Sequence, residues 1–324
     1  MKLVAFGGGT GLSILLRGLK KYTKDISAVV TVADNGGGSG VLREDLGMLP
    51  PGDMRNCIIA LADMEPVMIK LMQHRFKDGY LNGQSFGNLL IAAMYDIFGN
   101  YEHALKEIGS IFRLSGKVLP MTLQDTQLKA ILDNGKCILG EKDIPEFVSK
   151  SGCKLDKVTL VPEICIPLEE TIRDIKEADI IVLGPGSLYT SVMPNVLVQG
   201  IPDAIQESKA TVFYVCNLMT QPGETDNYNV VDHINAIIKH SNRYMIDYVI
   251  ANDELISEDQ IENYKYKGAK QVLIDQHQIK TLEEMNIKVI SSNFIEIKKN
   301  YIRHNSEKIG QLLFNYTNEK IARK

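Results

Sequence analysis

The sequence predicts a doubly wound α/β fold, with a mainly parallel sheet that carries helices on both faces. Two observations support this prediction. Short apolar runs, each long enough for one buried strand, alternate with segments of helical periodicity through most of the 324 residues. Four of these runs are followed by glycines, hydroxyl groups or an amide, a pattern typical of the carboxyl edge of a parallel sheet, where ligands bind.

The chain opens with a strand, a glycine-rich turn and a helix. Residues 2–6 are an apolar run, GGGTG follows at 7–11, and leucines then recur at helical spacing over 12–19. A second strand is predicted over 27–33. A right-handed crossover would make the two strands parallel.

Residues 56–113 are predicted to be mostly helical, whereas residues 118–165 are predicted to be rich in β-structure. Within the second segment, 128–132 and 136–139 flank Asn134-Gly135, which predicts a β-hairpin with a type I′ turn. We therefore expect a single α/β domain over residues 1–324 with a β-rich insertion at about 118–165. Alternation then resumes, with strands at 180–183, 211–215 and 248–251 and helices near 195–207 and 228–240.

Composition narrows the class of partner and the compartment. The formal net charge of −4 argues against nucleic acid as the main partner. The five cysteines are widely spaced, which predicts reduced thiols in a cytosol. No apolar run approaches the ~18 residues that cross a bilayer, and no signal peptide follows Met1. We expect a cytoplasmic protein without membrane insertion.

The first candidate site is the glycine-rich turn. Its small residues would let a phosphate approach backbone N–H groups at a helix N-terminus. The turn is not the dinucleotide fingerprint, because Leu12 and Ile14 stand where G-x-G-x-x-G needs its last glycine, and no P-loop motif occurs. The alternative is a tight turn without a ligand. The candidate residues are Gly8, Gly9, Thr10, Gly11 and Leu12.

The second candidate site is the loop DNGGGSG at 34–40, which combines flexible backbone with a carboxylate and hydrogen-bond donors. Asp34 would accept sugar hydroxyls or hold a divalent cation through phosphate oxygens. Asp53 and Arg55, in PPGDMRN, are predicted to return to the same pocket, although Asp53 would alternatively be only a helix N-cap. The loop residues chosen as candidates are Asp34, Asn35, Gly37 and Ser39.

Two later strand ends add further candidates. Gly186, Ser187 and Thr190 follow the strand at 180–183 and would suit an anion or a sugar. Asn217 follows the strand at 211–215 and could read a base or an amide edge, whereas Gln221-Pro222-Gly223 is interpreted as a turn.

No residue pattern predicts catalysis. The histidines lack metal-ligand spacing, and there is no Gly-x-Ser-x-Gly elbow. Cys216 lies in an apolar run with no basic neighbour, so burial would make its thiol unreactive. The sequence supports binding better than chemistry, and we assign no catalytic residue.

A set of ordered segments resembles the gluconeogenesis-factor (YvcK) family, a relative of the 2-phospho-L-lactate transferases of the CofD group. The segments, between residue 3 and about 310, are GGGTG, DNGGGSGVLRE, PPGDMRN, SFGNLLIAAM, GPGSLYTSVMPNVLVQGI and NLMTQPGETDNY. The resemblance implies a Rossmann-like fold in a cytoplasmic bacterial protein, associated with growth on gluconeogenic carbon sources and with envelope morphogenesis. It also implies a UDP-sugar such as UDP-N-acetylglucosamine, or an NAD(P)-like dinucleotide, as ligand. An envelope-synthesis protein as partner and a homo-oligomeric state are further expectations.

Carried over to this sequence, the resemblance places residues 8–12 at the phosphates and Asn217 in the nucleotide pocket, and Asn88 of SFGNLL joins the candidates. Tyr264, with Tyr266 as the alternative, and Arg303 would complete the UDP-sugar site, Arg303 as a bidentate phosphate clamp.

The chain departs from the family pattern at two places. Gln84 stands where the family often has the histidine of GH-x-x-GN. Asn35 and Gly38 depart from a more acidic, more serine-rich loop, which weakens a metal site built on paired aspartates.

The leading hypothesis is a regulator that binds a UDP-sugar and links carbon metabolism to envelope synthesis. The alternative is a metal-dependent transferase of a phosphate-containing group, with Mg²⁺ at Asp34 and Asp53 and a second pocket for a tricyclic acceptor. A third hypothesis, an NAD(P) dehydrogenase, lacks the glycine fingerprint and an acid–base pair.

Overall fold

A computed structural model describes residues 1–257, 260–261, 264, 268–298 and 300–322 of the chain. Tyr266, the alternative to Tyr264, lies outside these residues. The main sheet has seven strands in the order β10-β9-β8-β7-β1-β2-β3, and every neighbouring pair is parallel. Its strands are β1 (Leu3–Gly7), β2 (Ile26–Val30), β3 (Lys117–Pro120), β7 (Ile180–Leu183), β8 (Thr211–Val215), β9 (Tyr248–Asn252) and β10 (Lys288–Ser292).

The strand order reverses between β1 and β7, because the chain builds β1, β2 and β3 outward on one side and then crosses to β7 on the other. This reversal confirms the predicted doubly wound, Rossmann-like architecture. In such sheets the loops that leave the two strands at the reversal diverge, and a crevice opens between them. The glycine-rich turn after β1 and the Gly184–Ser187 turn after β7 both lie at this point.

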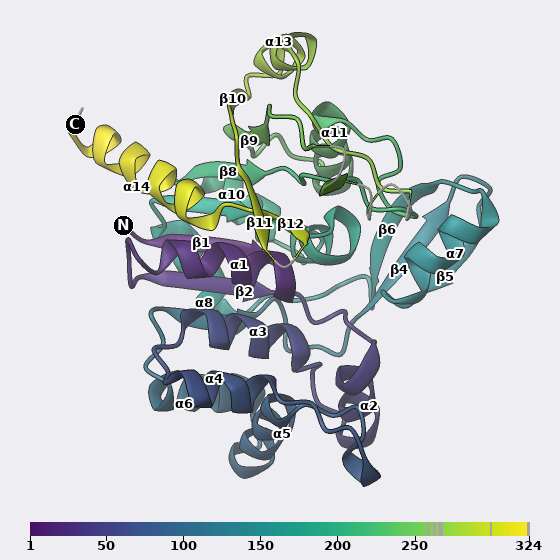
Figure 1. Cartoon of the computed structure of the whole chain (residues 1–324), viewed down its shortest axis with the longest axis vertical. Helices are drawn as coiled ribbons and strands as arrows, with labels where there is room; N and C mark the ends of the chain where they lie inside the picture. Colours follow the sequence, from purple (N-terminus) through teal and green to yellow (C-terminus); the bar gives the residue numbers. More distant parts are fainter. Residues whose placement is uncertain (258–259, 262–263, 265–267, 299, 323–324) are drawn as a thin grey trace.

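Helices cover both faces of the sheet, so β1, β2, β7 and β8 are buried along their whole lengths. Figure 1 shows α1 and α14 on one face and α8 and α10 on the other. The helices are α1 (Gly9–Leu19), α2 (Gly37–Leu46), α3 (Gly52–Leu61), α4 (Pro66–Gln73), α5 (Phe86–Phe98), α6 (Tyr101–Ile111), α7 (Asp143–Ser151), α8 (Glu169–Glu177), α9 (Met193–Val196), α10 (Ile201–Glu207), α11 (Val230–Ser241), α13 (Gln276–Glu284) and α14 (Ser306–Ala322), with single turns η1 (Gly79–Leu81) and η2 (Leu188–Val192).

A separate antiparallel sheet, in the order β5-β4-β6, lies beside the main sheet with α7 (Figure 1). Its strands are β4 (Gln127–Leu132), β5 (Cys137–Leu139) and β6 (Leu155–Val161). The predicted hairpin is confirmed, but its turn is not type I′. Only Gly135 of the three-residue loop 133–135 has a positive φ, 81°, as in a turn with a glycine bulge.

The boundary of this β-rich unit also differs from the prediction. The insertion was expected from about residue 118, whereas Lys117–Pro120 forms β3, the edge strand of the main sheet. The apolar run is too short to reveal which sheet it joins, since pairing with β2 is a tertiary contact.

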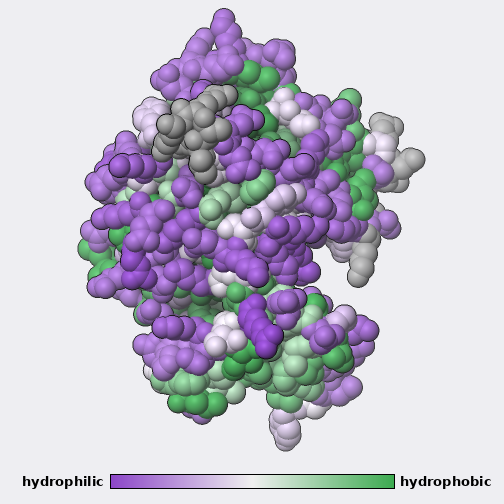
Figure 2. Space-filling model, turned by 90° about the vertical axis from the view of Figure 1, so that its left-hand side faces the viewer, coloured by the Kyte–Doolittle hydropathy of each residue, from purple (hydrophilic) through white to green (hydrophobic). Residues whose placement is uncertain are grey.

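A helical lobe formed by α2, α4, α5, α6 and η1 makes the lower part of the molecule in Figure 1. With α3, helices α4, α5 and α6 confirm the prediction that residues 56–113 are mostly helical. Figure 2 shows hydrophobic surface gathered over this lobe. Its exposed large hydrophobic residues are Val41, Leu46, Val67, Leu71, Tyr80, Leu81, Ile97 and Ile111.

A β11–β12 hairpin (Ile295–Lys298 and Tyr301–His304) precedes α14 and is antiparallel. Among the described residues no helix combines the length and the apolar character needed to cross a bilayer.

A buried ion cluster fastens the amino edge of the sheet. Asp174 of α8 is 1% exposed, and its carboxylate lies 3.0 Å from Lys2 Nζ and 2.7 Å from Lys117 Nζ. Ser27 Oγ of β2 donates to the same carboxylate at 2.7 Å. Burial alone would raise the pKa of Asp174, but these hydrogen bonds outweigh it and hold the pKa below its usual value. One side chain thus connects α8 to strands β2 and β3 and to the residue before β1.

We expect Asp174→Asn to lower the free energy of unfolding by about 3 kcal/mol at neutral pH, because it removes the anion between two lysines. Since the pKa of Asp174 is lowered by folding, its stabilising contribution is present at neutral pH and is lost as the pH falls. Urea unfolding at pH 7 and below pH 4 measures the difference in free energy of unfolding between the wild type and Asp174→Asn, with exposed Asp45→Asn as the control. An equal loss at both pH values would contradict the electrostatic role.

Candidate functional site

Three cavities meet at Thr10, where the loops after β1, β2, β7 and β8 converge. We call them the strand-end pocket, the acidic chamber and the α1 groove, with volumes of about 300, 350 and 910 Å³. Because parallel strands end at one edge of the sheet, segments far apart in the chain are brought together here.

The glycine-rich turn is built for close backbone approach. Helix α1 begins at Gly9, and Gly8 at its N-cap supplies no side-chain cap. A Cβ at Gly11 would overlap the Pro185 carbonyl, and one at Gly9 would overlap the Asp53 carboxylate. These glycines therefore let the turn pack closely against Asp53 and the loop after β7. Thr10 and Gly11, in the first turn of α1, line both the strand-end pocket and the acidic chamber, so their N–H groups lie at the type of helix end that binds phosphates.

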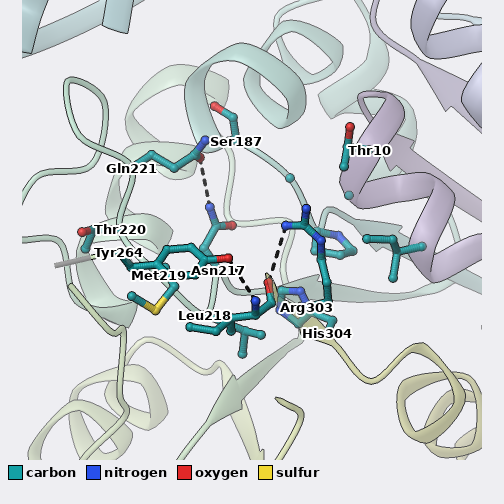
Figure 3. Close-up of a pocket in the computed structure, with 15 residues that line it drawn as sticks. Thr10, Ser187, Asn217, Leu218, Met219, Thr220, Gln221, Tyr264, Arg303 and His304 are labelled. Carbon is teal, nitrogen blue, oxygen red and sulfur yellow. Dashed lines mark hydrogen bonds between the residues drawn. The ribbon is translucent and has the colours of Figure 1, made fainter. Parts of the chain in front are cut away.

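The strand-end pocket brings together three predicted residues, Asn217, Tyr264 and Arg303, with Thr10, Gly11, Gly186 and Ser187. Figure 3 shows the side chains of Thr10, Ser187, Asn217, Tyr264 and Arg303 around one hollow. Asn217 Nδ2 donates to Gln221 Oε1 at 3.3 Å, and Asn217 Oδ1 is buried without a partner among the described residues. An unpaired buried acceptor is costly, so this oxygen is suited to a ligand N–H group.

Arg303 offers its guanidinium to a ligand. The residue opposite Arg303 in the hairpin is Glu296, yet the Glu296 carboxylate pairs with Lys298 at 2.8 Å. Within the described chain Arg303 has no carboxylate partner; its contacts are a 3.5 Å bond to the Ile302 carbonyl and the ring of Tyr301. Figure 3 shows the guanidinium directed into the pocket.

Two hydrogen bonds attach the hairpin to the walls of the pocket. His304 Nε2 donates to the Cys216 carbonyl at 2.9 Å, and Tyr264 Oη accepts from the Ile302 N–H at 3.0 Å. Burial and the nearby Arg303 lower the pKa of His304 to about 4, so the ring is neutral near pH 7. Arg303 precedes His304 in the chain, and Asn217 follows Cys216. The His304–Cys216 hydrogen bond therefore fixes the separation between Arg303 and Asn217.

The acidic chamber is lined by four carboxylates, those of Asp34, Asp53, Glu141 and Glu224. Burial, then repulsion from Asp34, raises the pKa of Asp53 to about 6, although the Gly9 N–H and Arg55 oppose the rise. Burial and Asp34 likewise raise the pKa of Glu141 to about 7. Burial raises the pKa of Glu224 to about 7, against hydrogen bonds that include one from Ser187. The chamber therefore takes up protons near neutral pH.

Asp53 is not the helix cap that its position allowed. The N-cap of α3 is Pro51, no side chain caps this helix, and Asp53 lies in its first turn. Its carboxylate instead meets the Gly9 N–H of the glycine-rich turn. The capping alternative is therefore wrong, because the carboxylate is engaged by the glycine-rich turn and not by the N–H groups of its own helix.

A metal ion in the acidic chamber would need oxygen atoms from a bound small molecule. Within the described residues, no group of three or more His, Cys, Asp or Glu side chains is arranged to hold an ion. Asp34 and Asp53 line one chamber, and phosphate oxygens would have to complete a Mg²⁺ shell around them.

Seven candidate residues line none of the described pockets. Gly8 caps α1, Leu12 is in the core, and Gly37 begins α2 with φ 51°. The side chain of Asn35 accepts the Lys142 N–H at 3.1 Å. The others are Ser39, packed against Gly52, and Arg55 and Asn88, which hydrogen-bond to each other at 3.0 Å. Most of the loop at 34–40 thus packs against protein, and Asp34 alone represents it in the chamber.

The two departures from the family pattern contact each other. A Cβ at Gly38 would lie 2.9 Å from Gln84 Oε1, an oxygen that is buried without a hydrogen-bond partner in the described chain. The glycine at 38 therefore makes room for the glutamine amide, and residue 84 acts on the shape of the loop.

Several lining residues were missed from the sequence. Gln221 lies in the segment 221–223 that is interpreted as a turn, and Glu224 directly follows it; the position of both after β8 is the available signal. Glu141 comes from the β-rich unit, where the Gly140–Lys142 turn docks on Asn35. Only the tertiary contact identifies it. Cys216 is 2% exposed, as expected, and burial raises the pKa of its thiol to about 12.

Comparison with known proteins matches residues 3–295 to the CofD family, described as 2-phospho-L-lactate transferase CofD. A protein of Thermoanaerobacterium thermosulfurigenes, provisionally named a gluconeogenesis factor, is 51% identical over 96% of this chain and 95% of its own. The gluconeogenesis factor of Bacillus subtilis is 44% identical, with 98% of each chain covered. A crystal structure of a UPF0052-family protein from Bacillus halodurans has a TM-score of 0.91 at 42% identity, covering 96% of this chain and 98% of that one.

We expect Asp53→Asn to stabilise the fold above pH 7. Folding raises the pKa of Asp53 to about 6, so the folded state holds its proton more tightly, and stability falls as pH rises from about 4 through 6. Removing the charge should raise the free energy of unfolding by about 2 kcal/mol at pH 8. Urea unfolding at pH 5 and 8, with Asp45→Asn as the control, measures it. A destabilised Asp53→Asn at pH 8 would refute this reading of the chamber.

Proposed function

This chain belongs to the CofD family, and from that premise we propose that it is a regulatory protein that binds a nucleotide sugar of the UDP-N-acetylglucosamine kind. The proposal gives it the role that its relatives' name prints, a gluconeogenesis factor, and extends this role to growth on gluconeogenic carbon sources and to maintenance of cell shape and envelope. The observation that carries it is the convergence of Asn217, Tyr264 and Arg303 with the N-terminus of α1.

Each part of such a ligand has a matching surface. Asn217 Oδ1, buried and unpaired in the described chain, would accept the imide N–H of uracil. The N–H groups of Thr10 and Gly11 and the guanidinium of Arg303 would hold the diphosphate. The sugar would enter the acidic chamber, where carboxylates accept hydrogen bonds from its hydroxyls. An NAD(P)-like dinucleotide could use the same phosphate contacts.

The proposal is a sensor and not an enzyme, because binding groups are assembled without an identified nucleophile. The proposal includes a cytoplasmic location, an envelope-synthesis protein as the receiver of the signal, and a homo-oligomer. The apolar surface of the helical lobe supports self-association, since exposed patches of this kind mark interfaces.

The transferase alternative rests on one specific observation. Asp34 and Asp53 line one chamber with Gly9, Thr10 and Gly11 of the glycine-rich turn. Carboxylates beside a diphosphate must be neutralised, either by protons or by a divalent cation. The α1 groove is large enough for an acceptor, but Tyr301 is its one aromatic residue among those described.

Arg303→Ala should weaken UDP-N-acetylglucosamine binding by about 1.5–3 kcal/mol, the scale of one lost charge-assisted contact. The free energy of unfolding should change little, because this guanidinium supports no ion pair in the described chain. Isothermal calorimetry on both proteins measures the effect, and Arg113→Ala, an exposed arginine outside the pockets, is the matched control. Unchanged affinity in Arg303→Ala removes it from the site.

The charge of the chamber predicts selectivity for neutral sugars. At pH 8, UDP-glucose and UDP-N-acetylglucosamine should bind at least tenfold more tightly than UDP-glucuronate, whose carboxylate would meet Asp53 and Glu141. Glu141→Gln should narrow this gap. Calorimetry with these ligands, NAD and GTP, each with and without Mg²⁺, tests it. A preference for GTP with strict Mg²⁺ dependence would support the transferase.

A further inference from the structure

The α1 groove is the largest of the described cavities and has no assigned role. Its volume of about 910 Å³ lies within the range of small-molecule sites. One wall is the face of α1 that carries Ser13 and Arg17, continued by Lys21 just beyond the helix, and the other is the β11–β12 hairpin. The groove leads away from the glycine-rich turn along α1.

The groove holds more positive than negative charge, and its two arginines have no carboxylate partner in the part of the chain that the structure describes. Four basic and two acidic side chains line it. Each acid is already bound by a lysine: Glu307 by Lys21 at 2.9 Å and Glu296 by Lys298 at 2.8 Å. Within the described chain, Arg17 and Arg303 are left without a carboxylate.

Helix α14, which borders the groove, adds to the positive potential inside it. Residues 305–307, at the start of the 17-residue helix α14, line the same cavity. Asn305 Oδ1 accepts the Lys308 N–H at 3.0 Å, so the cap side chain is engaged within the helix. The first turn of α14 therefore presents its positive dipole end to the groove.

From these observations we infer a second anion-binding site in the α1 groove, for a phosphate-bearing small molecule held by Arg17 and Arg303. The planar fork of an arginine matches the oxygens of a phosphate. Ile14 and Tyr301 would cover the apolar part of the molecule. This site goes beyond the proposed nucleotide-sugar function and does not require it.

Arg303 also lines the strand-end pocket, so it stands between the two sites. A ligand in one site that engages this guanidinium leaves less of it for the other. The two sites are therefore negatively coupled, and by linkage each ligand weakens the other by the same factor. Such coupling would let a phosphate metabolite set the sensitivity of the protein to its nucleotide ligand.

The competing explanation is that Arg17 is only a solvated cation that stabilises the last turn of α1. Calorimetric titration with inorganic pyrophosphate at low salt distinguishes an anion site in the groove from a merely solvated Arg17. The wild-type protein should bind two pyrophosphates, one at the glycine-rich turn and one in the groove. Arg17→Ala should lose the groove site or weaken it at least tenfold, and Arg113→Ala should keep both. Thermal unfolding of the variants checks that each is folded.

A repeat with saturating UDP-N-acetylglucosamine assigns the sites. It should displace the pyrophosphate that persists in Arg17→Ala and leave the groove pyrophosphate bound, but more weakly. Fewer than two pyrophosphates on the wild-type protein, or two undiminished on Arg17→Ala, would overturn the inference. If the UDP-sugar displaces neither while Arg17→Ala removes one, the groove site stands and the nucleotide-sugar proposal fails.

Discussion

The parallel order of the main sheet is the constraint on which the rest of the molecule depends. Because β1, β7 and β8 run in the same direction, their carboxyl ends open at one edge, and the reversal of strand order between β1 and β7 separates the loops that follow. The opposite edge is closed by Asp174 and its two lysines. The buried ion cluster thus stabilises the amino edge of the sheet, whereas the candidate binding groups lie at the carboxyl edge.

At the open edge, two opposing electrostatic features lie side by side. The N-terminal amides of α1 and the guanidinium of Arg303 favour anions, whereas the carboxylates of Asp34, Asp53 and Glu141 favour hydroxyls or cations. Burial of Asp53 and Glu141 in one chamber costs folding free energy and raises their pKa values to about 6 and about 7. A ligand with an anionic centre and a neutral polyhydroxyl end would suit both features.

The C-terminal hairpin completes the site from the far end of the chain. Hydrogen bonds from His304 to Cys216 and from Ile302 to Tyr264 anchor it to the loop after β8 and to residue 264. The same hairpin forms a wall of the α1 groove, so Arg303 borders two cavities. This arrangement physically connects events in one cavity with events in the other.

The sequence by itself determined the fold class, the main buried strands and the strand ends that form the site, since apolar periodicity and glycine-rich turns are local signals. Eleven of the eighteen candidate residues line the pockets: Gly9, Thr10, Gly11, Asp34, Asp53, Gly186, Ser187, Thr190, Asn217, Tyr264 and Arg303. Tertiary structure alone decided that β3 joins the main sheet, that Asn35 holds the insertion, and that Glu141 enters the chamber. These outcomes depend on contacts between residues distant in the chain, which leave no periodic trace in the sequence.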